Sequence, residues 1–502
     1  MSSHALFDLI SSLTMSEKRY FKLFSSRHVI GESNDYIHLF NAIDKQNVYS
    51  EDVLKKASYV KNLSQEKNYL YRLVLKSLNA YHSSLNNKSR IFELLKQVEI
   101  LFHKGLYGQS LKIVKKAKKI AKDNDLFNHE LIIHEIEAEI LSKQLLYSQA
   151  LDNFDRHDKL LDIAVNFSTI QKIAFESYDK GLSLGEVRSG ADLEVMKKFV
   201  YADQIKDDSM VLSSRAEMYR LSVLLAYFYM TKDKKKMLQY SEKLSSHYIN
   251  NPSLIEYSTM GYIFSLSSHV RALIQNDRTE NAWELIGLLE NIDKELNINN
   301  SINIQARAFI YSMNLRIEVY LLKNSFDLCL KWINKNKNEL IKFEAFISKP
   351  FLYECYFLLA KFYFITGDYK LALKYSNKII NDIDFKLRAD ILSVIRLLNL
   401  LIHFELNNDF TLKYLTKNTL NYLKSKKRLY KVEDELIRFM KHQQKSKIGF
   451  LEDDLKQLRE QMHFWKSQDF ESIPFSKFDF GMWAQARLNK VLICDLYQQT
   501  NL

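Results

Sequence analysis

Residues 353–381, Tyr-Glu-Cys-Tyr-Phe-Leu-Leu-Ala-Lys-Phe-Tyr-Phe-Ile-Thr-Gly-Asp-Tyr-Lys-Leu-Ala-Leu-Lys-Tyr-Ser-Asn-Lys-Ile-Ile-Asn, predict two helices joined by a tight turn at 366–368. Apolar residues before the turn recur at the period of a helix, and further apolar residues off this stripe predict burial on more than one side. Gly367 supplies the freedom that ends the first helix, and Asp368 can cap the second. The inward face of the second helix carries Leu371, Ala372, Tyr375 and Ile379.

Fainter copies of this turn recur along most of the chain. Most have an aromatic anchor or its substitute, a small residue three positions later, and then Leu. One weaker copy has Met237 at the small position, and the copy at Phe410 has Lys413 there. We expect all three positions to face inward, as a repeated packing signature. The anchors are 40–47 residues apart, except for one interval of 87 that predicts a degenerate hairpin near Gly190. The anchors are Tyr107, Tyr147, Lys234, Thr279, Phe326, Tyr369 and Phe410.

The hairpin at 353–381 resembles the tetratricopeptide family. The family pattern Trp-x2-Leu-Gly-x2-Tyr is matched in spacing, whereas the later aromatic falls one residue early at Tyr375 and no proline closes the unit. The period also exceeds the family's length of about 34 residues and overlaps that of HEAT-type units. The matching residues are Tyr356, Leu359, Ala360 and Tyr363, followed by Gly367, Tyr369 and Ala372. We therefore expect an all-α fold, a solenoid of antiparallel helical hairpins (elongated tetratricopeptide-like repeats) with atypical helical caps.

The sequence pattern divides the chain into three parts. Residues 1–90 predict an N-terminal helical module, in which Thr14-Met-Ser-Glu17 has the form of a capping box. Residues 91–425 carry the repeats, and residues 426–502 predict a C-terminal helical cap that ends in one helix from Phe478 to Leu496. The Ser-Glu-Lys-Arg-Tyr-Phe start and the Phe-Asp-Phe-x-x-Trp close make the chain similar to a group of uncharacterised bacterial repeat proteins, which implies no particular activity.

Composition limits the class of protein. Hydrophobic residues make up 47% of the 502 residues, enough for a substantial core, while 11 Gly and 3 Pro are too few for the turns of a sheet protein. The three cysteines are far apart and odd in number, which favours a reducing compartment. The N-terminus lacks a secretory pattern, and the longest apolar run, residues 391–404, is shorter than the roughly 20 residues that span a bilayer. We expect a cytoplasmic protein that does not enter a membrane.

Motifs that would indicate an enzyme are absent from the sequence. It contains neither phosphate-binding glycine loop, Gly-x-x-x-x-Gly-Lys-Ser/Thr or Gly-x-Gly-x-x-Gly, and no Gly-x-Ser-x-Gly nucleophile elbow. His129 and His134 are five residues apart, which rotates their imidazoles by about 140° on a helix instead of stacking them for a metal. The prediction is therefore a protein that is not an enzyme and holds no cofactor or metal.

The most distinct charge feature lies in residues 112–122, in a chain whose formal net charge is +12. On a helical wheel five lysines share one face opposite the apolar residues, with Lys118 at the edge of that face. Such a face is most often a solvated outer surface, but it can also dock an acidic partner segment or a phosphate backbone. The five are Lys112, Lys115, Lys116, Lys119 and Lys122.

Three functions stay open at this point. The first is a non-catalytic scaffold that holds a protein or peptide partner in a helical-repeat groove. The second is a nucleic-acid or ribonucleoprotein binder that uses basic helix faces, with a further basic cluster at Lys424–Lys431. The third is an enzyme with an unfamiliar site, which would need a deep pocket lined by clustered polar groups.

Overall fold

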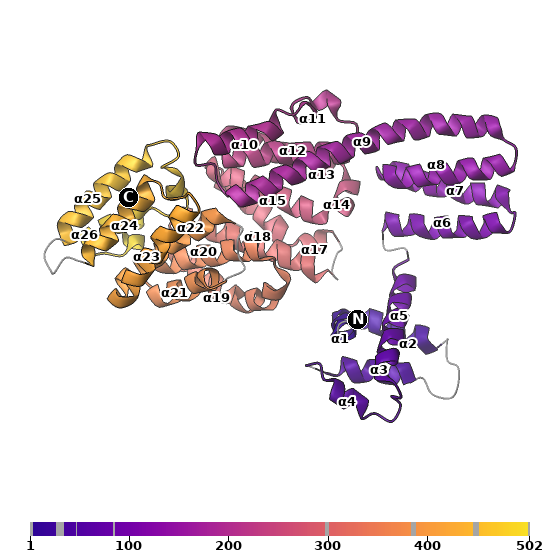
Figure 1. Ribbon diagram of the computed structural model, residues 1–502, viewed down its shortest axis with the longest axis horizontal. Helices are drawn as coiled ribbons and strands as arrows, with labels where there is room; N and C mark the ends of the chain where they lie inside the picture. Colours follow the sequence, from indigo (N-terminus) through magenta and orange to yellow (C-terminus); the bar gives the residue numbers. More distant parts are fainter. Residues whose placement is uncertain are drawn as a thin grey trace. The chain divides into compact units, whose positions relative to one another are not determined.

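The computed structural model describes residues 4–26, 35–46, 48–83, 86–296, 301–382, 388–444 and 451–499. Over these ranges the chain forms 27 α-helices and three short 3-10 helices, and no strand (Figure 1). Helices that follow one another along the chain pack mainly as neighbouring pairs. The all-α class that the sequence predicts is confirmed.

Two compact units, residues 1–164 and 165–502, divide the chain within the long helix α9, Tyr147–Leu184. In the first unit, one core lies among α1–α5 and another among α6–α8. The helices before α9 are α1 (Ala5–Ser12), α2 (Met15–Ser26), α3 (Asp35–Asp44), α4 (Glu51–Lys55), α5 (Leu63–Tyr81), α6 (Asn87–His103), α7 (Tyr107–Asp123) and α8 (Phe127–Lys143).

The second unit contains a large core that runs from α18 to α27. Its first helices after α9 are α10 (Gly190–Val200), α11 (Asp203–Lys206), η1 (Asp208–Met210), α12 (Ser214–Met230), α13 (Lys234–Asn250), α14 (Pro252–Tyr257), α15 (Thr259–Gln275), α16 (Thr279–Glu290) and α17 (Ile292–Glu295). The others are α18 (Ile302–Leu322), α19 (Phe326–Phe343), η2 (Glu344–Phe346), α20 (Lys349–Ile365), α21 (Tyr369–Ile380), α22 (Ala389–Glu405), α23 (Asp409–Ser425), α24 (Lys431–Gln443), α25 (Leu451–Lys466), η3 (Ile473–Ser476), α26 (Phe480–Asn489) and α27 (Ile493–Gln499).

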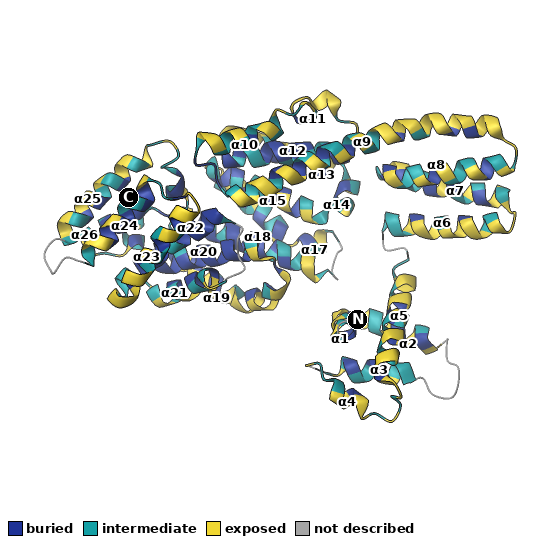
Figure 2. Ribbon diagram, in the orientation of Figure 1, coloured by how far each residue is buried: buried dark blue, intermediate teal, exposed yellow. Residues whose placement is uncertain are grey.

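The hairpin predicted at 353–381 is present as α20 and α21. Gly367 has a φ of +83°, and the Asp368 side chain accepts a hydrogen bond from the Leu371 N–H at 3.0 Å. The left-handed glycine and the cap therefore act as the sequence predicts. Helix α20 is buried on nearly all sides, as is α22 (Figure 2).

The predicted capping box at the start of α2 is also confirmed. The Thr14 backbone N–H donates to Glu17 Oε2 at 2.7 Å, and the Glu17 N–H donates to Thr14 Oγ1 at 3.2 Å. These reciprocal bonds satisfy two backbone donors that the first turn of a helix leaves without partners.

The repeat anchors mark the starts of helices. Phe410 is the second residue of α23, and each of the other six anchors is the first residue of its helix. In each of these six copies, the residue three positions after the anchor is buried. These buried residues are Ser110, Ala150, Met237, Ala282, Cys329 and Ala372.

The expectation that anchor and Leu also face inward holds only in some copies: Phe326 is buried, and Tyr107, Leu111, Tyr369 and Leu373 pack partly buried against a core. Tyr147, Leu151 and Leu330 are exposed, and Phe410 exposes 95% of its surface. The small residue lies on the side of the second helix that meets its partner helix, whereas the next position is rotated by about 100° away from that contact. Only the small-residue position is therefore buried in each of the six copies.

Two further expectations meet different outcomes. A break does occur near Gly190, where α9 ends at Leu184 and the Ser189 side chain caps α10. The single C-terminal helix is wrong, because Lys490 takes a left-handed φ of +55° and separates α26 from α27. The Val491 N–H then donates to the Ala486 carbonyl at 3.1 Å, which is the long bond of a Schellman motif. The domain limits at 90 and 425 stay predictions.

Buried ion pairs connect helices throughout the second unit. Arg271 Nη2 on α15 lies 2.6 Å from Glu354 Oε1 on α20 and 3.3 Å from Glu318 Oε1 on α18. Arg388, just before α22, lies 3.0 Å from Asp390 Oδ2 and 3.7 Å from Glu354 Oε2. Arg271 and Arg388 thus share Glu354, which joins α20 to α15 and to the start of α22, while Arg271 adds α18 through Glu318.

The same network continues into the C-terminal segment. Lys477 Nζ lies 3.8 Å from both Asp390 Oδ2 and Glu186 Oε1, and Lys232 Nζ lies 3.1 Å from Glu186 Oε1. We call these residues together the charge cluster. Its members are Glu186, Lys232, Arg271, Glu318, Glu354, Arg388, Asp390 and Lys477.

The pKa values of two carboxylates in the charge cluster, Glu354 and Asp390, are lowered by their basic neighbours. Burial alone would raise the pKa of Glu354, but the guanidiniums of Arg271 and Arg388 outweigh burial and lower it. The pKa of Asp390 is lowered in the same way by Arg388 and Lys477, again against burial. The buried charges compensate one another and make the packing of this unit dependent on each partner.

We expect Arg271→Met to destabilise the protein by about 3 kcal/mol or more at neutral pH, because it leaves Glu354 and Glu318 without their strongest partner. Because its folded pKa is lowered, Glu354 stabilises the fold above its unfolded pKa of about 4.3, and this contribution is lost as the pH falls through the folded value. Urea unfolding should therefore show a wild-type advantage that shrinks from pH 7 toward pH 3. Arg438→Met, which removes an exposed pair with Asp434, is the control and should leave the midpoint unchanged.

We expect Gly367→Ala to destabilise the protein by about 1–2 kcal/mol, because alanine is strained at positive φ. The added Cβ would also lie 2.8 Å from Leu492 Cδ2, so that side chain must shift. Gly287→Ala is the matched control, since Gly287 lies inside α16 with no atom within 4 Å of the added Cβ, and it should stabilise by roughly 0.5–1 kcal/mol. Equal effects of the two substitutions on urea unfolding would contradict the role given to Gly367.

Candidate functional site

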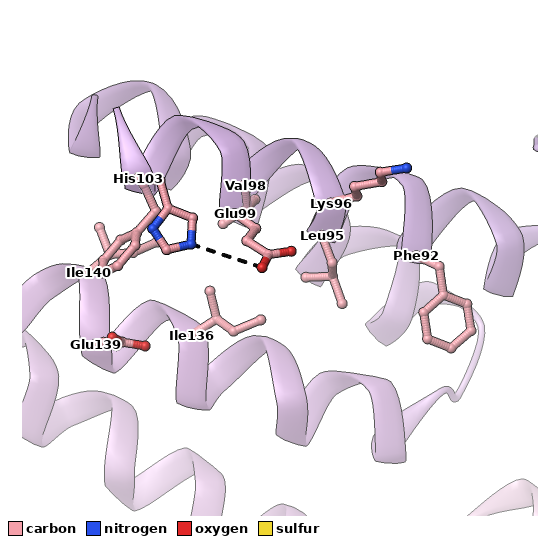
Figure 3. A pocket seen from close by; sticks show the side chains of 10 residues that line it. Phe92, Leu95, Lys96, Val98, Glu99, His103, Ile136, Glu139 and Ile140 are labelled. Carbon is pink, nitrogen blue, oxygen red and sulfur yellow. Dashed lines mark ion pairs between the residues drawn. The ribbon is translucent and has the colours of Figure 1, made fainter. Parts of the chain in front are cut away.

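An open cleft of about 480 Å³ lies between α6 and α8 in the first unit (Figure 3). Helix α7 packs against both of these helices but contributes no lining residue. We call this cleft the α6–α8 groove. Its apolar residues are Phe92, Leu95, Val98, Phe102, Ile136 and Ile140, and its polar residues are Lys96, Glu99, His103 and Glu139.

The groove exists because α6 carries more apolar surface than α7 covers. Ile91 and Val98 are buried in the core that α6 shares with α7. Phe92 and Leu95 lie beside this buried stripe on the surface of α6. Phe92 is exposed and Leu95 is half-buried. The core among α6–α8 buries the stripe of Ile91 and Val98 fully and covers Leu95 only in part, which leaves apolar surface of α6 open.

The rim of the groove is polar and carries both signs of charge. His103 Nε2 lies 4.0 Å from Glu99 Oε1, drawn as a dashed line in Figure 3, and both side chains are mostly exposed. Lys96 and Glu139 are also exposed. At one end, the ring of Phe92 packs edge-on against His129 of α8, with 5.3 Å between the ring centroids. The arrangement can accept apolar side chains while charged groups remain in water at its edges.

The five candidate lysines lie on α7, outside the groove. Each of them is exposed, and no carboxylate of the described residues is within ion-pair distance of any of them. Opposite them, Val114, Ala117 and Ala121 are buried. The structure thus confirms that the five lysines share an exposed face, while their role in binding stays a prediction. They are Lys112, Lys115, Lys116, Lys119 and Lys122.

Lys118 behaves differently from the other lysines of α7. Its side chain turns toward α8 and lies 2.6 Å from Glu137 Oε2, half-buried. It also donates to Asn153 Oδ1 of α9 at 3.4 Å. The edge position that the wheel gives Lys118 therefore becomes part of the contact between helices.

The two histidines of α8 have different neighbours. His129 faces the ring of Phe92 in α6, whereas the Nδ1 of the buried His134 hydrogen-bonds Asn153 Oδ1 in α9. The Asn153 amide in turn donates to the His134 carbonyl at 2.6 Å. Across the described ranges, no three His, Cys, Asp or Glu side chains gather as the ligands of a metal ion would.

The apolar lining of the groove is the part that the sequence prediction missed. The sequence does hold a signal, because Ile91-Phe92 and Leu94-Leu95 place apolar residues side by side on α6 and widen its apolar face. That width alone does not show which stripe α7 covers. The open stripe is visible only once α7 and α8 are in place.

Comparison of the sequence with protein-family models gives no match, and comparison with curated proteins gives none either. In the part of the chain that the structure describes, we find no helix long and apolar enough to cross a membrane.

Proposed function

We propose that this protein is a non-catalytic scaffold that holds a protein or peptide partner in a helical-repeat groove. The observation that carries the proposal is the α6–α8 groove, whose apolar floor and charged rim suit an apolar segment of a partner. Its volume of about 480 Å³ lies within the range of about 300–1,000 Å³ that is usual for ligand pockets. Grooves between helices commonly receive an amphipathic helix through a few apolar anchors.

The finer description of the fold belongs to the same proposal. We take the paired helices to be elongated tetratricopeptide-like hairpins of a solenoid with helical caps, because six anchors begin helices at the predicted spacing. A cytoplasmic location is part of the proposal as well. Burial raises the pKa of the Cys329 thiol to about 12, and Cys355 is a buried free thiol, which favours a reducing compartment.

The scaffold function is tested by selecting random displayed peptides on the wild-type protein. We expect enriched peptides to carry apolar residues at helical spacing and to lose binding to Phe92→Ser and Ile136→Lys, since both changes alter the lining of the groove. Phe92 is exposed, so its substitution leaves the fold intact. Phe410→Ser, at an exposed position on α23, is the control and should bind as the wild type does. Enriched peptides that bind both groove variants as well as the wild type would contradict the proposal.

A second candidate function is nucleic-acid or ribonucleoprotein binding through the lysine face of α7. Five exposed lysines that have no carboxylate partner among the described residues present the positive charge that a phosphate backbone would neutralise. This candidate differs from the first in its salt dependence, because binding to phosphates releases counterions.

For this second candidate, we expect Lys115→Glu with Lys119→Glu to weaken binding to labelled single-stranded RNA and to reduce the slope of log affinity against log salt by about 2 units. Fluorescence anisotropy over a salt series measures both quantities. Lys370→Glu with Lys374→Glu, on the exposed face of α21, is the matched control for net charge. Binding that the two double variants weaken equally would remove the lysine face as the site.

A further inference from the structure

The first part of α9 exposes a row of large apolar side chains. Tyr147, Leu151, Phe154 and Leu161 expose 58%, 66%, 53% and 43% of their surfaces. On a helix these positions fall within one narrow stripe, because successive members are four, three and seven residues apart. We call this stripe the α9 face. Single exposed apolar residues are ordinary on a protein surface, but four along one stripe, with the exposed Asp158 between Phe154 and Leu161, are not.

Helix α7 shows what normally covers such a face. The anchors Tyr107 and Tyr147 begin α7 and α9, so each position in α7 corresponds to the position 40 residues later in α9. Phe154 and Leu161 thus correspond to Val114 and Ala121, which are fully buried. These α7 residues share a core with Ile91 and Val98 of α6 and with Ile133 and Ile140 of α8. Part of the α9 face, Phe154 and Leu161, is therefore exposed where the neighbouring helices α6 and α8 cover the corresponding residues of α7.

The charges beside this face are inverted between the two helices. Asp155, Asp158 and Asp162 of α9 take the positions of lysines in α7. Asp155 and Asp162 have no ion-pair or hydrogen-bond partner among the described residues, and Asp158 has only His157, at 3.9 Å. The corresponding lysines are Lys115, Lys118 and Lys122.

The α7–α8 contact shows the use of a charge at this place. Lys118 Nζ, next to the buried apolar row of α7, lies 2.6 Å from Glu137 Oε2 of the covering helix. On α9 the equivalent position is Asp158, so a covering helix would need a basic residue where α8 has Glu137. The three aspartates would repel an acidic helix and attract a basic one.

We infer that the α9 face binds a basic amphipathic helix of a partner protein, which takes the place that a next repeat helix would occupy. This inference rests on the proposed scaffold function and gives that scaffold a partner class. The apolar side of the partner helix covers Tyr147, Leu151, Phe154 and Leu161, and its lysines or arginines meet Asp155, Asp158 and Asp162. The α6–α8 groove is lined by other residues, so the two surfaces can be tested independently.

Two designed helical peptides of equal length test the inference on the full chain. Both carry the same leucine stripe, flanked by lysines in one peptide and by glutamates in the other. In fluorescence anisotropy we expect the lysine peptide to bind and the glutamate peptide to bind at least about tenfold more weakly. Phe154→Ser with Leu161→Ser should weaken the binding of the lysine peptide by about tenfold or more. Phe410→Ser is the control and should change nothing.

A charge exchange gives the second, independent measurement. With Asp155→Lys, Asp158→Lys and Asp162→Lys, we expect the preference to reverse, so that the glutamate peptide binds better than the lysine peptide. All three aspartates are exposed, so these changes leave the core of α9 in place. Reversal of the preference supports a docked helix with charges in register.

Several results would overturn the inference. One is equal binding of the two peptides, and another is binding that neither set of variants changes. A wild-type dimer in sedimentation velocity that Phe154→Ser with Leu161→Ser converts to a monomer would show that a second copy covers the face. If the lysine peptide does not bind while the selected library peptides still lose binding to Phe92→Ser and Ile136→Lys, this inference is wrong and the proposed scaffold function is unaffected. Loss of groove binding with the lysine peptide still bound would remove the groove but not the α9 face.

Discussion

The close approach of paired helices depends on a compact side chain near the start of each second helix. Ser110, Ala150, Ala282, Cys329 and Ala372 occupy this place, three residues after the anchor, and all are buried. Two helices at the usual distance of 8–10 Å leave little room at the crossing, so a large rigid side chain there would separate them. The sixth copy uses Met237, whose unbranched side chain adapts to the space that its neighbours leave. In five of the six copies the repeat thus constrains side-chain volume at one position, and in all six it keeps that position buried.

This constraint explains how far the sequence predicts the fold. Helix starts such as the Thr14–Glu17 box and the Gly367–Asp368 turn depend on hydrogen bonds between residues only a few positions apart, so they can be predicted from the sequence. The charge cluster could not be predicted in the same way, because Glu186 and Lys477 meet only after the intervening helices have packed. The α6–α8 groove was missed for a related reason. Its floor is defined by what α7 leaves uncovered, which is a property of three helices together.

The two units use apolar surface in different ways. In the second unit α20 and α22 are enclosed, and the charge cluster locks several helices through partners that cannot be removed singly. In the first unit, Phe92 and the α9 face are in contact with water. Apolar surface that a fold leaves open costs solubility unless polar groups surround it, and here lysines and aspartates do so.

The comparison of α7 with α9 separates what the repeat fixes from what it leaves free. Ser110 and Ala150 hold the same buried position, while Lys115 and Asp155 hold the same exposed position with opposite charge. Packing needs the first pair to be alike, since both helices cross a partner at close range. The packing does not fix the sign of the charge at the second position. That charge can therefore determine which side chains bind beside it, as Lys118 on α7 pairs with Glu137. A chain built from such units can keep one architecture and still present surfaces of opposite charge on the equivalent helices of successive repeats.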